Sequence, residues 1–275
     1  MKIFFSAIVI AMLSLNLTFS QKKINIFTHT VTGKPDVVFE INNPFFCDFY
    51  IDIQLKNLIN LSLDSSFTPL KIVPPGNHTL LKLVAVKSKL ITNYGYKYAM
   101  YKGRPLSAKP SIAALKLPFN ENKNVEVVCP ELSLEDLVNQ KETDYHEINF
   151  KMAAGDSIFA CKEGVVSEIK TNEGYSYIEI FHSDGTFARY ENINKLKTWV
   201  KEGSKILTGQ ALAAVGNNQT SPTLSFTLYY VDQKKLDLEN NYSYLIPLFT
   251  KKGQSIASTL NNGERFGQAK ESLGR

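Results

Sequence analysis

The stretch IEIFHSDGTFARY, residues 178–190, decides the fold of the second half of the chain. Two alternating segments flank Ser183-Asp184-Gly185, and an Asp-Gly pair between such segments is a strong signal for a β-hairpin. The flanking sequence is divided at regular intervals by glycines at 155, 164, 203, 209 and 216 and has no helical period. Residues 146–249 are therefore expected to form an all-β, antiparallel structure between a barrel and a sandwich.

The first half of the chain also has the pattern of strands separated by turns. Residues 37–41 (VVFEI) place Val37, Phe39 and Ile41 on one face, and residues 48–55 (DFYIDIQL) alternate in the same way. This pattern is typical of an antiparallel sheet with one face in water. Residues 21–128 are therefore predicted to be a β-sandwich. The tyrosine-rich run 94–101 fits a half-buried strand better than a sugar-stacking surface.

The N-terminus has the features of a signal peptide, which is predicted over residues 1–20. Lys2 precedes an apolar run over 3–19, and small residues lie just before Gln21. The alternative, an uncleaved membrane anchor, is disfavoured because the run is short and contains Ser6 and Ser14. We therefore expect an exported protein, periplasmic or extracellular, with no stable membrane span after cleavage.

Composition excludes some classes of function and leaves others open. The 275 residues are 44% hydrophobic, enough for two buried cores, and carry 31 basic against 26 acidic side chains. With no basic stripe, nucleic-acid binding is not expected. The three cysteines, Cys47, Cys129 and Cys161, form no metal-binding pair, and a pairing of Cys47 with Cys129 stays open. Residues 129–145 are expected to be a linker with a short helix, and residues 250–275 a polar, loosely attached tail.

Four segments of the second half, in order, resemble the lysostaphin/LytM-type zinc metalloendopeptidases, which cut peptide cross-links of bacterial cell walls and have the duplicated hybrid motif fold. The segments are NFKMAAGDSIFACKEGVVSEI (149–169), IEIFHSDGTFARYENI (178–193), VKEGSKILTGQALAAVGN (200–217) and PTLSFTLYY (222–230). Four matches in register are far more specific than one.

The resemblance also implies where the zinc site would lie. The family's H-x-x-x-D falls on Tyr145 and Asn149, the histidine of its Y-x-H-L on Asn192, and the pair of its H-L-H-F on Thr223 and Ser225. Phenol, amide and neutral hydroxyl groups are poor zinc ligands, and they do not acidify a water molecule. We therefore predict no catalytic residue, metal or cofactor. The five residues are expected to cluster as a neutral polar groove, or as a polar patch without a ligand.

Other chemistry-bearing residues have simpler explanations in the sequence. His146 and His182 are interpreted as partly exposed strand residues, because no second histidine completes a metal site with either. Paired carboxylates of a glycosidase are an alternative explanation for Glu147, Glu179 and Glu191, but scattered strand glutamates are usually solvated.

Three functions follow from this sequence. The favoured one is a non-catalytic protein of the cell envelope that binds peptidoglycan or regulates a cell-envelope hydrolase. The alternatives are an active zinc peptidase with a displaced site, and a structural or adhesion protein acting through the N-terminal sandwich.

Overall fold

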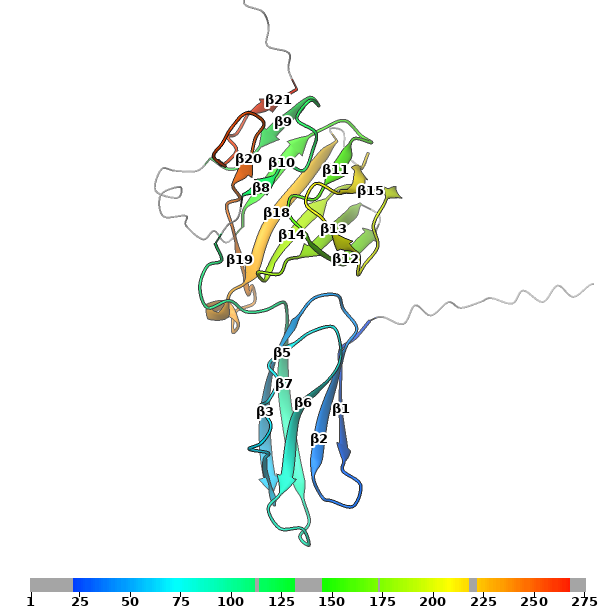
Figure 1. The fold of residues 1–275 in the computed structure, drawn as a ribbon, viewed down its shortest axis with the longest axis vertical. Helices are drawn as coiled ribbons and strands as arrows, with labels where there is room; N and C mark the ends of the chain where they lie inside the picture. Colours follow the sequence, from blue (N-terminus) through cyan, green and yellow to red (C-terminus); the bar gives the residue numbers. More distant parts are fainter. Residues whose placement is uncertain (1–21, 112–113, 132–144, 173, 218–221, 268–275) are drawn as a thin grey trace, which may run out of the picture.

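The computed structural model describes residues 22–111, 114–131, 145–172, 174–217 and 222–267. In Figure 1 these residues form two β-rich domains, a smaller one built from β1 to β7 and a larger one that contains the later strands. The only regular helix among them is the short 3-10 helix η1 (Gln233–Lys235). The prediction of an all-β chain is confirmed. No helix in the described residues is long and apolar enough to cross a membrane. The expected signal peptide, residues 1–20, lies outside these residues, and so does most of the expected linker, residues 129–145.

The first domain is a sandwich of two sheets with strand orders β1-β2-β6-β4 and β5-β3-β7. Val37, Phe39 and Ile41 point into the space between the sheets and are fully buried, as their alternation predicts. Ile51 contributes from the facing sheet, and Tyr94 meets Phe39 edge to face with ring centroids 5.5 Å apart. The strands are β1 Asn25–Thr30, β2 Val37–Asn43, β3 Phe49–Ile59, β4 Leu61–Leu63, β5 Ile72–Val73, β6 Gly76–Ala85 and β7 Asn93–Lys102.

The second domain is built on a large antiparallel sheet of order β16-β12-β13-β14-β18-β10-β9-β21, with β19 added beside β18. The predicted hairpin around Asp184 is β13 and β14, and Gly185 has a φ of +87°, as this turn requires. Its strands are β8 Leu115–Lys116, β9 Val125–Val128, β10 Glu147–Lys151, β11 Ser157–Phe159, β12 Gly164–Asn172, β13 Tyr175–Phe181, β14 Thr186–Glu191, β15 Ile193–Thr198, β16 Lys205–Ile206, β17 Ala211–Val215, β18 Thr223–Val231, β19 Tyr242–Tyr244, β20 Phe249–Thr250 and β21 Arg265–Phe266.

One face of the large sheet carries the core of this domain. Phe226 and Ile178 from the sheet pack with Leu212 and Ile158 of a second sheet, β11-β17-β15. Among the described strands the large sheet runs from β16 at one edge to β21 at the other without closing. The expected barrel character is therefore absent from the described strands, and the domain consists of stacked open sheets.

The domain limits differ from those expected at two places. Strand β9 pairs with β10, and β8 pairs with β20, so the chain already belongs to the second domain before residue 128. In the region expected to be a loose tail, Leu260 is buried in the core and β21 pairs with β9. The sequence after residue 249 did not predict these contacts, because it is polar and because a single buried leucine and two short strands give little periodic signal.

Candidate functional site

The second face of the large sheet is polar, although most of it is covered. On β18, Thr223, Ser225, Thr227 and Tyr229 alternate with residues that enter the core. Strand pairing places Asn149 of β10 and Glu191 of β14 on either side of Ser225. In the next row, Glu147 and Arg189 lie on either side of Thr227 in the same way. We call this surface, on β10, β18, β14 and β13, the polar face.

A chain of hydrogen bonds joins three of the five predicted site residues. The Ser225 hydroxyl donates to Asn149 Oδ1 at 2.6 Å, and Asn149 Nδ2 donates to Glu147 Oε1 at 2.8 Å. The Tyr145 hydroxyl donates to the other oxygen of the Glu147 carboxylate. Glu147 thus connects Tyr145 to Asn149, which sequence reasoning did not foresee. The signal that could have found it is its i, i+2 spacing from both Tyr145 and Asn149.

The remaining two predicted residues have different places. Thr223 is on the polar face two residues before Ser225, opposite Lys151 of β10. Asn192 lies just after β14, where its backbone N–H donates to Ser176 O and its carbonyl accepts from Gly216 N. Its φ of +64° is a left-handed conformation that asparagine tolerates better than most residues. Asn192 therefore has a structural role in this bend whatever its side chain binds.

Next to this series of hydrogen bonds, the polar face contains a buried ion cluster. Glu179 of β13 is fully buried, and its carboxylate is bound by Lys102 Nζ at 2.5 Å and by Arg189 Nη2 at 2.9 Å. The Tyr229 hydroxyl donates to the same carboxylate. Burial alone would raise the pKa of Glu179, but Lys102 and Arg189 outweigh it and hold the pKa at about 2. Lys102 belongs to the first domain, so this cluster joins the two domains.

The partly exposed border of the polar face, which we call the rim, carries aromatic and acidic side chains. Tyr145 and Tyr175 are 58% and 39% exposed, and the Tyr175 hydroxyl donates to Glu191 at 3.2 Å. Burial raises the pKa of Glu191, and the neighbouring Arg189 opposes that shift only in part. Arg189 stacks over Tyr177, with its guanidinium carbon 4.6 Å from the ring centroid. The rim therefore offers ring faces and carboxylate oxygens to a ligand.

Comparison with protein families now identifies this domain. The family model "Peptidase family M23" matches residues 144–238, which span the strands β10 to β18 that carry the polar face. Residues 144–238 form an M23 domain. The predicted likeness to the LytM-type peptidases is confirmed at this level.

Several solved structures of peptidases and one of an M23 protein are similar to parts of the chain. The catalytic domain of lysostaphin from Staphylococcus simulans has 22% identity over 36% of this chain and 86% of its own, with a TM-score of 0.28. A mutant catalytic domain of the prophage-encoded M23 protein EnpA from Enterococcus faecalis has 21% identity over 46% and 85%, with a TM-score of 0.29. A zinc-containing peptidase from Vibrio cholerae has 11% identity over 74% and 77%, with a TM-score of 0.33. No functionally curated protein matches the chain.

The residues at the positions where the resemblance locates the zinc ligands do not fit a zinc ion. The Asn149 amide uses both its oxygen and its nitrogen in hydrogen bonds, and Ser225 is its neutral hydroxyl donor. Burial, with the Glu147 carboxylate next, raises the pKa of the Tyr145 phenol, which disfavours the phenolate that a metal would need. Across the described ranges, no group of three or more His, Cys, Asp and Glu side chains is arranged to hold a metal.

Two expectations about single residues are wrong. His146 and His182 are only 3% and 0% exposed rather than partly exposed. Burial lowers the pKa of both, that of His182 to about 4, and the ring Nδ1 of His182 is 2.6 Å from Glu163 O. Glu179 is not a solvated strand glutamate, because the first domain covers it. The sequence could not show this, since the covering residue, Lys102, is far away along the chain.

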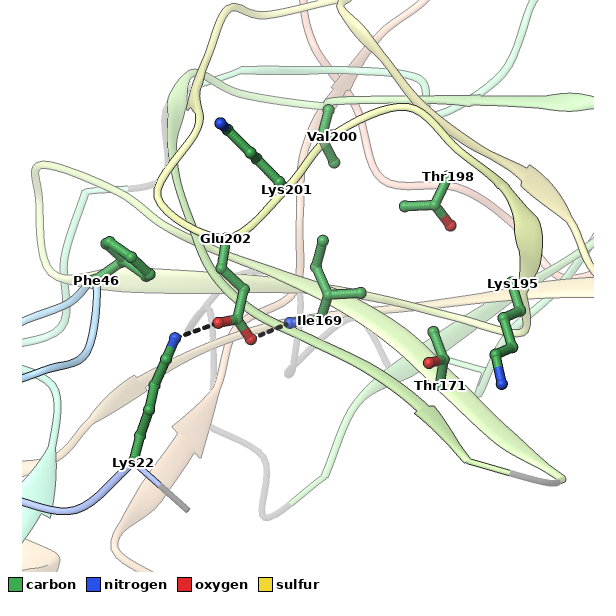
Figure 2. A pocket seen from close by; sticks show the side chains of 9 residues that line it. All are labelled: Lys22, Phe46, Ile169, Thr171, Lys195, Thr198, Val200, Lys201 and Glu202. Carbon is green, nitrogen blue, oxygen red and sulfur yellow. Dashed lines mark hydrogen bonds and ion pairs between the residues drawn. The ribbon is translucent and has the colours of Figure 1, made fainter. Parts of the chain in front are cut away.

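A depression of about 610 Å³ lies at the junction of the two domains, away from the predicted site residues. Figure 2 shows Lys22 reaching Glu202, whose carboxylate also accepts the backbone N–H of Ile169. Nearby, a Cβ on Gly203 would lie 2.7 Å from the ring of Phe46, so glycine permits this close approach. The depression therefore belongs to the contact between the domains.

Proposed function

We propose that this protein is an exported, non-catalytic member of the M23 group that binds peptidoglycan on its polar face. The observation that supports the proposal is the hydrogen-bonded chain from Tyr145 through Glu147 and Asn149 to Ser225. It occupies the positions at which the family resemblance locates zinc. The polar groups there satisfy one another and have no hydrolytic chemistry of their own, while the M23 framework around them is retained.

The chemistry of the rim favours a peptide or amino-sugar ligand. Carboxylates accept hydrogen bonds only, so Glu147 and Glu191 are suited to amide N–H and amino groups. Exposed rings such as Tyr145 and Tyr175 add flat apolar area without much conformational freedom to lose. Cell-wall stem peptides and N-acetylated sugars present both N–H donors for the carboxylates and apolar surface for the rings.

The test is co-sedimentation of the chain from Gln21 onward with isolated peptidoglycan sacculi. The chain is expected to pellet with the sacculi without releasing soluble fragments. Thr223→Trp places a bulky ring on the polar face and should weaken pelleting at least tenfold. Leu207→Trp is the matched control, because Leu207 is 70% exposed on a turn outside the polar face, and it should bind like the parent chain.

Two outcomes would overturn the proposal. Release of fragments that stops with a chelator and returns with zinc would show an active peptidase with a displaced site. A chain that stays in the supernatant would exclude the cell wall as ligand and leave regulation of an envelope hydrolase, for which a pull-down is the next experiment.

A further inference from the structure

The end of the first domain that lies away from the M23 domain exposes a group of large apolar side chains. Figure 1 shows this end at the turns that follow β3 and β6. Ile59 and Leu90 are each 54% exposed, Val86 is 63% exposed and Ile91 is 88% exposed. The apolar residues that lie between the two sheets of the sandwich are buried, whereas these four are exposed at the turns.

Asn60 holds these side chains in one rigid unit. It has a φ of +54° in the turn between β3 and β4, and its carbonyl accepts the N–H of Val86 at 3.1 Å. Its side-chain amide donates to Lys87 O at 2.8 Å and to Leu90 O at 3.0 Å, while its Oδ1 accepts from Lys87 N at 2.8 Å. Because the two turns are cross-linked in this way, the apolar residues stay exposed instead of folding back onto the sheet.

A third turn, residues 31–36, joins the same end, because Asp36 Oδ1 accepts the N–H of Ala85 at 2.8 Å. We define the basic apolar tip as residues 31–36, 56–60 and 86–92. Its charged residues are one aspartate, Asp36, which is engaged with the backbone, and four exposed lysines, Lys34, Lys56, Lys87 and Lys89. Four positive charges against one negative charge give a net charge of +3.

We propose that the basic apolar tip is a docking surface for anionic lipid, by which the protein attaches to a membrane face. Apolar side chains that project from a rigid turn can enter the headgroup region, and lysines around them are attracted to acidic headgroups. Asn60 orders the turns before binding, so docking loses little conformational entropy. The net charge of the tip is complementary to that of an anionic bilayer. Docking there leaves the polar face of the M23 domain free, and the proposal does not depend on what that face binds.

The experiment is vesicle co-sedimentation of the chain from Gln21 onward, which removes the apolar segment 3–19 and keeps every described residue. Vesicles of phosphatidylethanolamine with phosphatidylglycerol are compared with vesicles of phosphatidylcholine alone. We expect binding to the anionic vesicles that falls as salt rises, because screening shortens the reach of the lysines. Binding to phosphatidylcholine should be much weaker.

Two variants separate the apolar and the charged contributions. Ile91→Ser should weaken binding to anionic vesicles about tenfold, the effect of removing one well-buried apolar side chain. The double variant Lys87→Gln with Lys89→Gln should weaken it about fivefold for each lysine at low salt. Leu196→Ser is the matched control, because Leu196 is 93% exposed on the M23 domain, and it should not change binding. Circular dichroism verifies that each variant is folded.

Three results would overturn the proposal. They are no binding to anionic vesicles, equal binding by the parent chain and the tip variants, and a concentration-dependent dimer that Ile91→Ser abolishes. The last would assign the tip to a second copy of this chain.

Discussion

Lys102 Nζ lies 2.5 Å from Glu179 Oε1, and the two residues come from different domains. Lys102 ends the last strand of the sandwich, and its ammonium also binds Glu168 at 2.6 Å. Glu179 sits on the polar face of the M23 domain and is 1% exposed at its side chain. One lysine of the first domain therefore neutralises a buried carboxylate of the second, which couples the stability of the M23 domain to the docking of its neighbour.

Replacing Lys102 by methionine should destabilise the M23 domain. The Met side chain retains most of the packing but leaves Glu179 with Arg189 as its remaining cationic partner. Removal of one partner from a buried ion pair costs about 3 kcal/mol. Urea unfolding followed by the fluorescence of Trp199, the single tryptophan, reports on this domain. Lys97→Met, at an exposed position on the same strand, is the control and should unfold like the parent chain. Equal midpoints for Lys102→Met and the parent chain would contradict the coupling.

The stability of the protein should fall in acid because of Glu179. Its pKa is about 2 in the folded chain against 4.5 for an ordinary glutamate. A lowered folded-state pKa gives stability that is complete above about pH 4.5 and is lost as the pH falls toward 2. Glu179→Gln removes this contribution.

The contribution of Glu179 to stability is isolated by acid titration of the parent chain and of Glu179→Gln, again followed by Trp199 fluorescence. The variant should be less stable than the parent at pH 7, and the difference between them should shrink below pH 4.5. Other carboxylates with lowered pKa, such as Asp184, remain in both chains and cancel in the comparison. A difference that is constant from pH 7 to pH 2 would refute the assignment.

The three thiols should differ in reactivity. All three are free, and burial raises the pKa of Cys47 and Cys161 to about 12, while Cys129 is half-buried. The reactive form is the thiolate, which is scarce for the two buried thiols at pH 8. With a disulfide reagent we expect one thiol, that of Cys129, to react in the native protein and three to react in urea. In Cys129→Ser no thiol should react before unfolding. Rapid reaction of two or more thiols in the native parent chain would show that Cys47 or Cys161 is accessible.

Much of the fold could be read from local pattern. The alternation of Val37, Phe39 and Ile41 predicts a buried strand face because successive strand residues point to opposite sides. The Asp184-Gly185 turn predicts its hairpin because glycine accepts the left-handed backbone that such a turn needs. The tail is the counterexample, since Leu260 is held by distant core residues that no local pattern reveals.

The candidate site was only partly predictable for the same reason. The motif order locates Asn149 and Ser225, which the structure shows to be hydrogen-bonded partners on adjacent strands. Glu147 was seen in the sequence but could not be connected to them, because its hydrogen bonds depend on side-chain direction. In the sequence Glu179 cannot be told from any other strand glutamate, because its burial depends on the first domain.

The sequence by itself determined the all-β class, the hairpin at the centre of the large sheet, and the likeness of the second half of the chain to the M23 peptidases. These features follow from periodicity, turn chemistry and motif order, which depend on neighbouring residues or on the order of segments in the sequence. Only the tertiary structure decided that Lys102 neutralises Glu179 and that three turns meet around Asn60 and Asp36 at the basic apolar tip. Both depend on strand register and domain docking, which bring together residues that are distant along the chain.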